Sequence, residues 1–261
     1  AEIADLINCA FLEPMQSSYQ PLNTPPFELD SDVPLLSEAT TCHMLSKVCI
    51  NKASGPDGIP NWVLKDYAEV LAAPVCNIIN SSYAEQKLPT LWKHANITPI
   101  PKEKPVTDIC KHLRPVSLTP TMSKMAEEFI VNEYIAPAVL EIIDPNQYGV
   151  IPKSSTTQAL VSMLHRWSEA TDASGSTVRV VLLDYRKAFD LVDHSILARK
   201  IYNLNIPRGV ARWVCDFLCE RKQRVKLSHD CLSEWGRVPS GVPQGTKLGP
   251  WLFILMINDL D

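Results

Sequence analysis

The chain has 261 residues, of which 46% are hydrophobic and 21% charged, and its formal net charge is −4. This composition is that of an ordinary folded protein, and it excludes disordered, collagen-like and disulfide-scaffold proteins. The longest apolar run, Leu248–Ile257, spans ten residues, whereas a membrane helix needs about twenty. Acids stand near the N-terminus where a signal peptide would carry bases. We therefore expect an intracellular chain, in the nucleus or the cytoplasm, with no membrane partner.

Charge is unevenly distributed along the chain. Residues 1–90 carry a balance of −7, and residues 91–261 carry +3. Two basic stretches stand out in the second part: Lys93, Lys102, Lys104, Lys111 and Arg114, and then Arg221, Lys222, Arg224 and Lys226. Because affinity for a phosphate backbone follows local charge, these stretches are compatible with nucleic-acid binding. A solvated lysine face is the alternative interpretation of each.

The eight cysteines are scattered, which predicts free thiols rather than disulfides in a chain without a secretory signal. A zinc site can be drawn from Cys215, Cys219, His229 and Cys231. No Cys-x-x-Cys pair supports it, and the first two cysteines follow a helical apolar pattern, so free thiols remain the prediction.

In chain order, residues 13–36 are rich in proline and acids and predict an extended linker. Ser37 is expected to cap a helix that runs to about Lys52. Pro60 is expected to open a second helix ending near residue 72, and Pro74 a third that ends before Pro89.

Residues 95–100 and 114–118 read as the two strands of a hairpin with basic residues near its tip. A helical stretch follows from Thr121, interrupted at Pro137. Ser154 and Ser155 are expected to cap a further helix, whose apolar stripe predicts a buried face.

The segment Thr177–Tyr185 is β-branched and apolar, which predicts a strand covered on both faces. A helix is expected after it, and another over 210–221. Residues 224–229 alternate as a half-exposed strand does, with residues 235–239 as the candidate partner. A Gly-Pro-Gln-Gly loop and a helix opened by Pro250 follow, so the order of elements predicts an α+β fold.

Three features are candidates for chemistry. Asp184 ends the apolar strand, where a carboxylate is fixed yet accessible to a metal ion; a helix-capping role is the alternative. Gln244 lies in a loop with two glycines and a proline, and its amide can both donate and accept hydrogen bonds. Lys102 and Arg114, on opposite arms of the hairpin, are placed to bind a triphosphate, or else they only solubilise the surface. Phe189, on its pattern alone, reads as a core residue.

Six stretches, taken in order, resemble the reverse transcriptase of LINE-type (non-LTR) retrotransposons. They are KASGPDGIPNWVLK (52–65), LPTLWKHANITPIPK (88–102), HLRPVSLTPTMSKMAEEFI (112–130), QYG with SSTTQAL (147–160), VVLLDYRKAFDLVDH (180–194) and SGVPQGTKLGPWLFILMINDL (240–260). The resemblance covers residues 37–261. The most specific stretches are the fifth and the sixth.

The resemblance implies an RNA-directed DNA polymerase with the right-hand polymerase fold. Residues 1–36 would then be a linker from an upstream region, 37–176 the fingers with the start of the palm, and 177–261 an incomplete palm, with the thumb absent. The implied partners are an RNA template, a DNA primer and dNTPs.

It also implies roles for individual residues. Asp184, with the backbone carbonyl of Tyr185, would bind the two catalytic Mg²⁺ ions. Phe189 would lie under the incoming sugar, against the core interpretation above. Gln244 and Gly245 would pack against the nascent pair. Arg114 and, with a less certain alignment, Lys102 would bind the triphosphate.

Two departures from the family pattern matter. Relatives carry Gly-Phe-Arg where this chain has Gly149, Val150 and Ile151, so a template contact by that arginine is missing. The Asp-Asp block that follows in the family is not in the sequence, which ends at Asp261. We therefore expect this chain alone to be inactive or nearly so, and a non-catalytic remnant with at most nucleic-acid binding is the alternative function.

Overall fold

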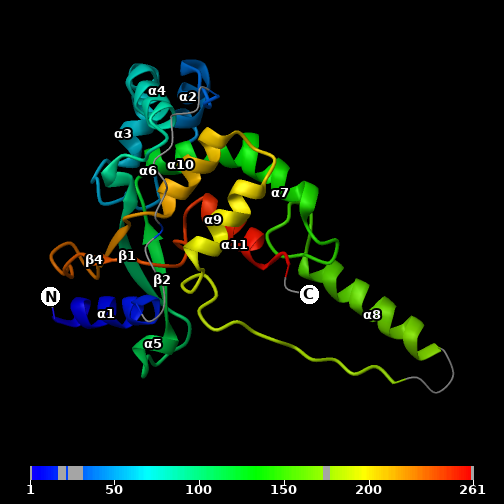
Figure 1. Ribbon diagram of the computed structural model, residues 1–261. Helices are drawn as coiled ribbons and strands as arrows, with labels where there is room; N and C mark the ends of the chain where they lie inside the picture. Colours follow the sequence, from blue (N-terminus) through cyan, green and yellow to red (C-terminus); the bar gives the residue numbers. More distant parts are fainter. Residues whose placement is uncertain (1, 17–21, 23–31, 173–176, 260–261) are drawn as a thin grey trace.

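The computed structural model describes the chain except residues 1, 17–21, 23–31, 173–176 and 260–261 (Figure 1). Its helices and strands are, in chain order, α1 (Glu2–Gln16), α2 (Glu38–Ser46), α3 (Asn61–Asp66), α4 (Ala68–Ala84), η1 (Thr90–Lys93), β1 (His94–Pro101), α5 (Ile109–His112), β2 (Leu113–Leu118), α6 (Thr121–Ile130), η2 (Val131–Ile135), α7 (Ala136–Ile142), α8 (Thr156–Asp172), α9 (His194–Asn203), α10 (Arg208–Leu218), β3 (Lys222–Val225), β4 (Gly236–Arg237) and α11 (Leu248–Ile257). This mixture of helices and one sheet confirms the α+β expectation.

The sheet has four strands in the order β2-β1-β3-β4. The predicted hairpin is confirmed: β1 pairs antiparallel with β2, with Ile97 opposite Ser117 and Ile100 opposite Arg114. β3 joins β1 in parallel, and β4 pairs antiparallel with β3. The second strand pair is therefore confirmed only in part, because β3 covers residues 222–225 rather than 224–229 and pairs with β4 through Lys222 and Gln223.

Two hydrophobic cores hold the elements together. The larger one lies among helices α2 to α11 and includes Tyr83, whose hydroxyl donates to the Ala126 carbonyl at 2.8 Å. The smaller one joins α1 to the sheet and consists of Ala4, Ile7, Phe11, Ala95, Ile97, Leu113 and Val225. Ala4, Ile7 and Phe11 recur on one face of α1 because a helix repeats every 3.6 residues.

The prediction of a linker over residues 1–36 is wrong for residues 2–16, which the structure describes. Residues 2–16 form α1, and Phe11, Leu12 and Met15 are each only 5% exposed. Pro14 lies in the last turn and does not prevent the helix. Burial of the apolar face outweighs the proline and acidic composition on which the linker prediction depended. Most of the remaining linker range falls outside the described residues.

Helix boundaries agree in part. Ser37 caps α2 as predicted, since its hydroxyl accepts from the Thr40 N–H, although α2 ends at Ser46 rather than near Lys52. Pro74 does not open a helix but lies inside α4. The expected interruption at Pro137 is not formed: α6, the π-helical η2 and α7 follow one another without a gap, and the residues at both junctions keep right-handed helical backbone.

The predicted strand at 177–185 is not formed. Described residues 177–185 make no strand pairing, and Val181, Leu182 and Leu183 are at least 80% exposed. A strand needs a partner for its backbone groups, and no described strand lies beside this segment. The helix expected directly after it begins only at His194, with Asp193 as its N-cap.

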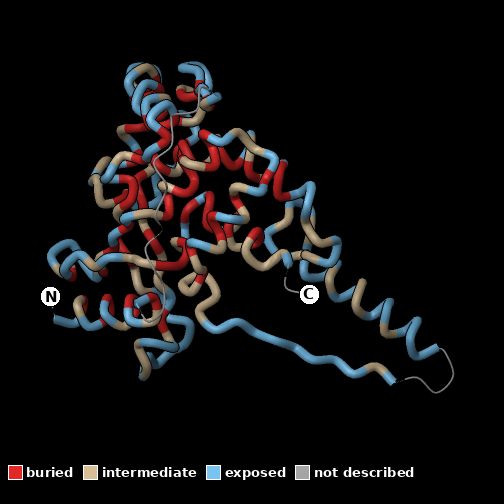
Figure 2. Tube along the Cα trace, in the orientation of Figure 1, coloured by how far each residue is buried: buried red, intermediate tan, exposed pale blue. Residues whose placement is uncertain are grey.

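The segment 177–185 and helix α8 project together from the rest of the molecule (Figures 1 and 2). No residue of α8 is buried, so the expected burial of its apolar stripe is wrong; Leu160 and Leu164 are more than half exposed. Ser155, by contrast, caps α8 as predicted, with its hydroxyl accepting from the Gln158 N–H at 3.2 Å.

Candidate nucleotide-binding cleft

The Gln244 loop (residues 240–246) is fixed by backbone hydrogen bonds on two sides. The Ser117 N–H of β2 donates to the Gln244 carbonyl at 2.7 Å. On the other side, the Gly241 and Val242 N–H groups donate to the carbonyls of Val192 and Phe189 at 2.9 and 2.8 Å. The loop therefore connects the edge of the sheet to the segment after Asp184.

Glycine is required where the loop meets β2. Gly245 has φ +115, and a Cβ on it would lie 2.8 Å from the Ser117 carbonyl oxygen. L-residues avoid that backbone region, and the contact is shorter than ordinary packing permits. This geometry gives a physical reason for the second glycine of the motif.

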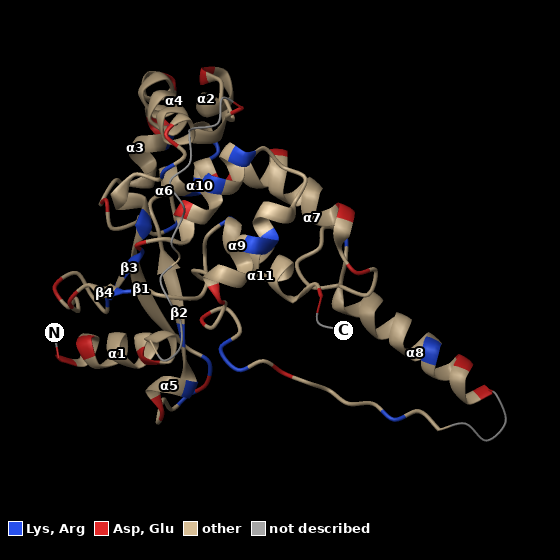
Figure 3. Ribbon diagram, in the orientation of Figure 1, with Lys and Arg blue, Asp and Glu red and all other residues tan. Residues whose placement is uncertain are grey.

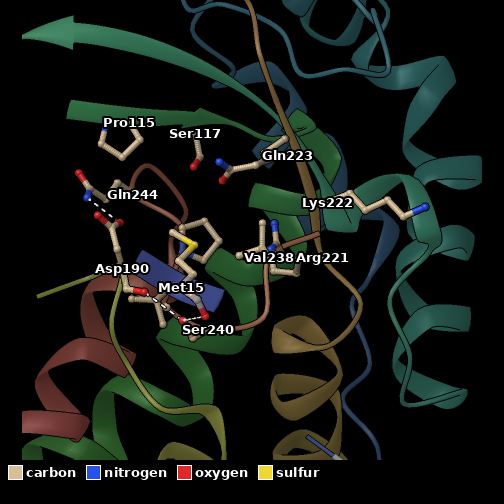
Figure 4. Close-up of a pocket in the computed structure, with 14 residues that line it drawn as sticks. Met15, Pro115, Ser117, Asp190, Arg221, Lys222, Gln223, Val238, Ser240 and Gln244 are labelled. Carbon is tan, nitrogen blue, oxygen red and sulfur yellow. Dashed lines mark hydrogen bonds between the residues drawn. The ribbon is translucent and has the colours of Figure 1, made fainter. Parts of the chain in front are cut away.

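The Gln244 side chain contacts Asp190. Its amide donates to Asp190 Oδ1 at 3.4 Å (Figure 4). Burial raises the pKa of Asp190, and this effect outweighs the opposing influence of the Gln244 hydrogen bond and of Lys187 and Lys102. Asp190 and Gln244 are 54 residues apart, and their pairing left no signal in the sequence.

Six of the seven residues singled out from the sequence line a single open cleft of about 930 Å³. They are Lys102, Arg114, Asp184, Tyr185, Phe189 and Gln244. Gly245 is not in its lining, but it follows Gln244 directly and holds the loop against β2. The hairpin, the segment after 183 and the Gln244 loop thus each contribute one wall.

Helix α1 supplies a part of the lining that sequence reasoning missed. Phe11 and Pro14 face the same cleft. Neither belongs to a motif, and both lie in the range predicted to be a linker. The helical spacing of the apolar residues at positions 4, 7 and 11 was the available signal for a packed helix.

Phe189 is half-buried and lies between the cleft and the larger core. Its ring stacks on that of Phe253 in α11, with centroids 4.4 Å apart and an interplanar angle of 20°. It therefore packs as a core residue on one side and lines the cleft as well. Asp184 and Tyr185, in contrast, are exposed.

A buried carboxylate anchors the chain just after the loop. Glu127 is fully buried and accepts from the N–H groups of Lys247 and Leu248, at 2.8 and 3.3 Å, and from the Ser123 hydroxyl at 3.0 Å. Lys247 and Leu248 begin α11, where a negative charge is favourable. The buried Arg221 lowers the pKa of Glu127, although burial, which raises it, dominates.

Behind the loop lies a small cavity of about 30 Å³, lined by Met15, Ser117, Arg221 and Ser240 among others (Figure 4). Arg221 is 2% exposed; its Nη1 donates to the Phe217 carbonyl, and its Nη2 has no hydrogen-bond partner among the described residues. A cavity of this size holds one or two waters, which would satisfy that donor.

The donors in the cleft suit a hard cation. Carboxylate and carbonyl oxygens, as Asp184 and Tyr185 offer, are what Mg²⁺ prefers, and Mg²⁺ is often held by one or two carboxylates together with substrate phosphates. The described residues contain no group of three His, Cys, Asp or Glu side chains placed to hold a metal ion. Asp184 and the Tyr185 carbonyl are therefore donors of the kind that a divalent cation accepts.

Comparison with known proteins agrees with this geometry. Residues 100–261 match the family model described as "Reverse transcriptase (RNA-dependent DNA polymerase)". The chain belongs to the reverse transcriptase family. Among the described residues of this reverse transcriptase, no helix is long and apolar enough to cross a membrane.

Curated relatives narrow the family further. The chain is 28% identical over 253 residues to the probable RNA-directed DNA polymerase from transposon X-element of Drosophila melanogaster, covering 96% of this chain and 27% of that protein. It is 28% identical to the polymerase from mobile element jockey of the same species, over 90% of this chain and 25% of the relative. It is 24% identical to the Pol polyprotein of retrotransposable element R2 from Popillia japonica, over 70% and 25%. These names confirm the non-LTR retrotransposon branch, and the chain spans about a quarter of each relative.

Proposed function

We propose that this chain forms the fingers and part of the palm of an RNA-directed DNA polymerase that extends a DNA primer on an RNA template. Residues 37–176 would form the fingers with the start of the palm, and 177–261 the palm. One observation carries the proposal: six residues from four separate motifs lie around one cleft. Without a shared ligand, motifs about 10 to 140 residues apart in the sequence would have no reason to meet there.

Lys102 and Arg114 would bind the triphosphate of the incoming nucleotide. Both side chains are exposed on the hairpin, and neither forms an ion pair with a described acidic residue. A guanidinium binds phosphate oxygens through two parallel hydrogen bonds, and a lysine adds a point charge. The open cleft leaves both groups free to meet the ligand.

Asp184 and the Tyr185 carbonyl would hold Mg²⁺ with the nucleotide. When bound, the ions neutralise phosphate charge and favour in-line displacement at the α-phosphate by the primer 3′-hydroxyl. Asp184 is suited to this role because it is exposed and its carboxylate makes no ion pair with a described cation.

Phe189 and the Gln244 loop would position the sugar and base. Phe189 cannot retreat readily from the cleft, because Phe253 is stacked behind it; a ring fixed there would exclude a ribose 2′-hydroxyl. Gln244 is held by hydrogen bonds to Asp190 and to the Ser117 N–H, and Gly245 allows the loop backbone to lie close against β2. The loop is thus rigid enough to pack against a nascent base pair.

Nucleotide binding tests the proposal directly. A fluorescent N-methylanthraniloyl dGTP should bind the 261-residue chain in a Mg²⁺-dependent manner. Arg114→Ala should weaken binding by roughly 10- to 100-fold, the usual value of charge-assisted hydrogen bonds, and Asp184→Ala should abolish the Mg²⁺ dependence. Arg199→Ala, an exposed arginine of α9, is the matched control. Equal affinity in all three variants would refute the proposal.

We propose in addition that the chain on its own binds nucleotide without incorporating it. The observation that favours this is that the described residues hold no group of three or more His, Cys, Asp or Glu side chains placed to bind metal ions. Mg²⁺-dependent extension of a primer on RNA, lost in Asp184→Ala, would overturn it.

A further inference from the structure

We propose that the outer face of the sheet, opposite α1, is a binding surface for single-stranded template RNA ahead of the cleft. This inference rests on the proposed function, because an enzyme that copies RNA has to bind unpaired template RNA. The surface, called here the Trp235 platform, consists of His94 of β1, Lys222 and Arg224 of β3, Trp235, and Arg237 of β4, with the buried Asn96 of β1 hydrogen-bonded to Arg224 beneath it.

Strand register brings these residues together. His94 lies beside Lys222, and Asn96 beside Arg224, in the parallel pairing of β1 with β3. Lys222 lies opposite Arg237 in the antiparallel pairing of β3 with β4. Because side chains alternate along a strand, these residues share one face, while Gln223 and Val225 point to the other. That other face is covered by α1, where Gln223 donates to Asn8 Oδ1.

Charge on the platform is uncompensated. Figure 3 shows basic residues gathered along β3 and β4. Lys222 and Arg237 are exposed and Arg224 is half-exposed, and none of the three forms an ion pair with a described acidic residue. The surrounding cations and partial burial both lower the pKa of His94, with burial the larger cause. An electropositive surface of this kind attracts a phosphate backbone.

An aromatic side chain stands within the positive surface. The Arg224 guanidinium lies over the Trp235 ring, 4.4 Å from its centroid, and its Nε donates to Asn96 Oδ1 at 2.8 Å. The His94 ring is 4.9 Å from the same indole. Trp235 is nevertheless 37% exposed. Unpaired bases stack on such rings and on guanidinium planes in sheet-based RNA-binding proteins, and paired bases cannot.

The platform also leads toward the cleft. Arg114 pairs with Ile100, four residues along β1 from Asn96, so its side chain leaves the same face of the sheet. Four strand residues span about 13 Å. A single strand lying over Trp235 would therefore pass along β1 to the cleft that Arg114 lines.

Fluorescence anisotropy of a labelled 12-nucleotide oligouridine RNA with the 261-residue chain tests this inference. Trp235→Ala should weaken binding by about 5- to 100-fold, the usual effect of losing a stacked base, and Trp235→Phe should restore most of the affinity. Lys222→Ala combined with Arg237→Ala should lower the slope of log affinity against log salt by about 1.4, because each lost phosphate contact contributes about 0.7. Lys47→Ala and Lys65→Ala, exposed lysines of the α2–α3 region, should change neither quantity.

Failure of this inference is distinguishable from failure of the proposed function. Asp184→Ala should bind the RNA as the unmodified chain does, while losing its Mg²⁺-dependent nucleotide binding. The platform is refuted if Trp235→Ala and Arg224→Ala both bind the RNA within twofold of the unmodified chain, provided that thermal melting shows them folded. Equal affinity for a 12-base-pair RNA duplex would also refute it, because a duplex offers no base to stack.

Discussion

Gly245→Ala tests whether the Gln244 loop is locked onto β2. Alanine at φ +115 is strained by about 1–3 kcal/mol. Its Cβ would also lie 2.8 Å from the Ser117 carbonyl oxygen, a backbone atom that cannot rotate away; overpacking of this kind typically costs about 1–3 kcal/mol. Together we expect a loss of about 2–6 kcal/mol in the free energy of unfolding, unless the loop lifts away from the strand.

Two other glycines separate the contributions. Gly58 has φ +70 but nothing within 4 Å of an added Cβ, so Gly58→Ala isolates the backbone strain, about 1–2 kcal/mol. Gly149 has neither a positive φ nor a neighbour within 4 Å, and Gly149→Ala should change stability by no more than about 0.5 kcal/mol. Urea unfolding of the three variants measures the series.

Nucleotide binding shows which way the loop relieves the clash. If it lifts, the hydrogen bond from the Ser117 N–H to the Gln244 carbonyl breaks, and the affinity for labelled dGTP falls while part of the stability is recovered. The reasoning is refuted if Gly245→Ala unfolds at the same urea concentration as Gly58→Ala and also binds nucleotide unchanged.

Three further predictions concern the surroundings of the cleft. Glu127→Ala should destabilise the chain by about 3–5 kcal/mol, because it leaves three hydrogen-bond donors and the buried Arg221 without the carboxylate they interact with. Glu128→Ala, by contrast, removes a half-exposed carboxylate paired only at the surface and should stay within about 1 kcal/mol in the same urea assay. Burial raises the pKa of Asp190, so its contribution to stability is present below pH 3.8 and is lost as the pH rises through the raised pKa. The unfolding free energy of Asp190→Asn should therefore lack this decline. Parallel pH profiles of the variant and the unmodified chain would contradict the burial argument. Phe189→Ala should lower the free energy of unfolding by about 0.5–1.5 kcal/mol through loss of the stack with Phe253. The variant should also bind labelled GTP and dGTP with more nearly equal affinity than the unmodified chain does. Unchanged selectivity would exclude Phe189 from the sugar site.

Local signals predicted the parts of the fold that depend on neighbouring residues. The Ser37 cap and the hairpin of β1 and β2 each depend on a few adjacent residues, and both are confirmed. The strand at 177–185 depends instead on a partner elsewhere in the chain, which composition cannot report. The same holds for α8, whose apolar stripe has the right period but meets no neighbouring element.

The cleft residues were predictable for a different reason. Arg114, Asp184 and Gln244 belong to motifs of an identifiable family, so their proximity needed no folding argument. Phe11 belongs to no motif, and its place in the cleft follows only from the packing of α1 against the sheet. The pairing of Asp190 with Gln244 likewise follows from three-dimensional structure alone.

The way the Gln244 loop is anchored has a consequence for biosynthesis. Its contacts join residues far apart in sequence: Ser117 with Gln244, Asp190 with Gln244, and Glu127 with Leu248. Since the chain emerges from the ribosome N-terminus first, the hairpin and Glu127 are made long before their partners. The Glu127 carboxylate therefore remains hydrated until α11 has been synthesised and can donate its N–H groups. Contacts between residues so far apart in the sequence slow folding. Ribosome-bound chains that end before residue 244 should therefore have no complete nucleotide cleft, whatever their content of helix and strand.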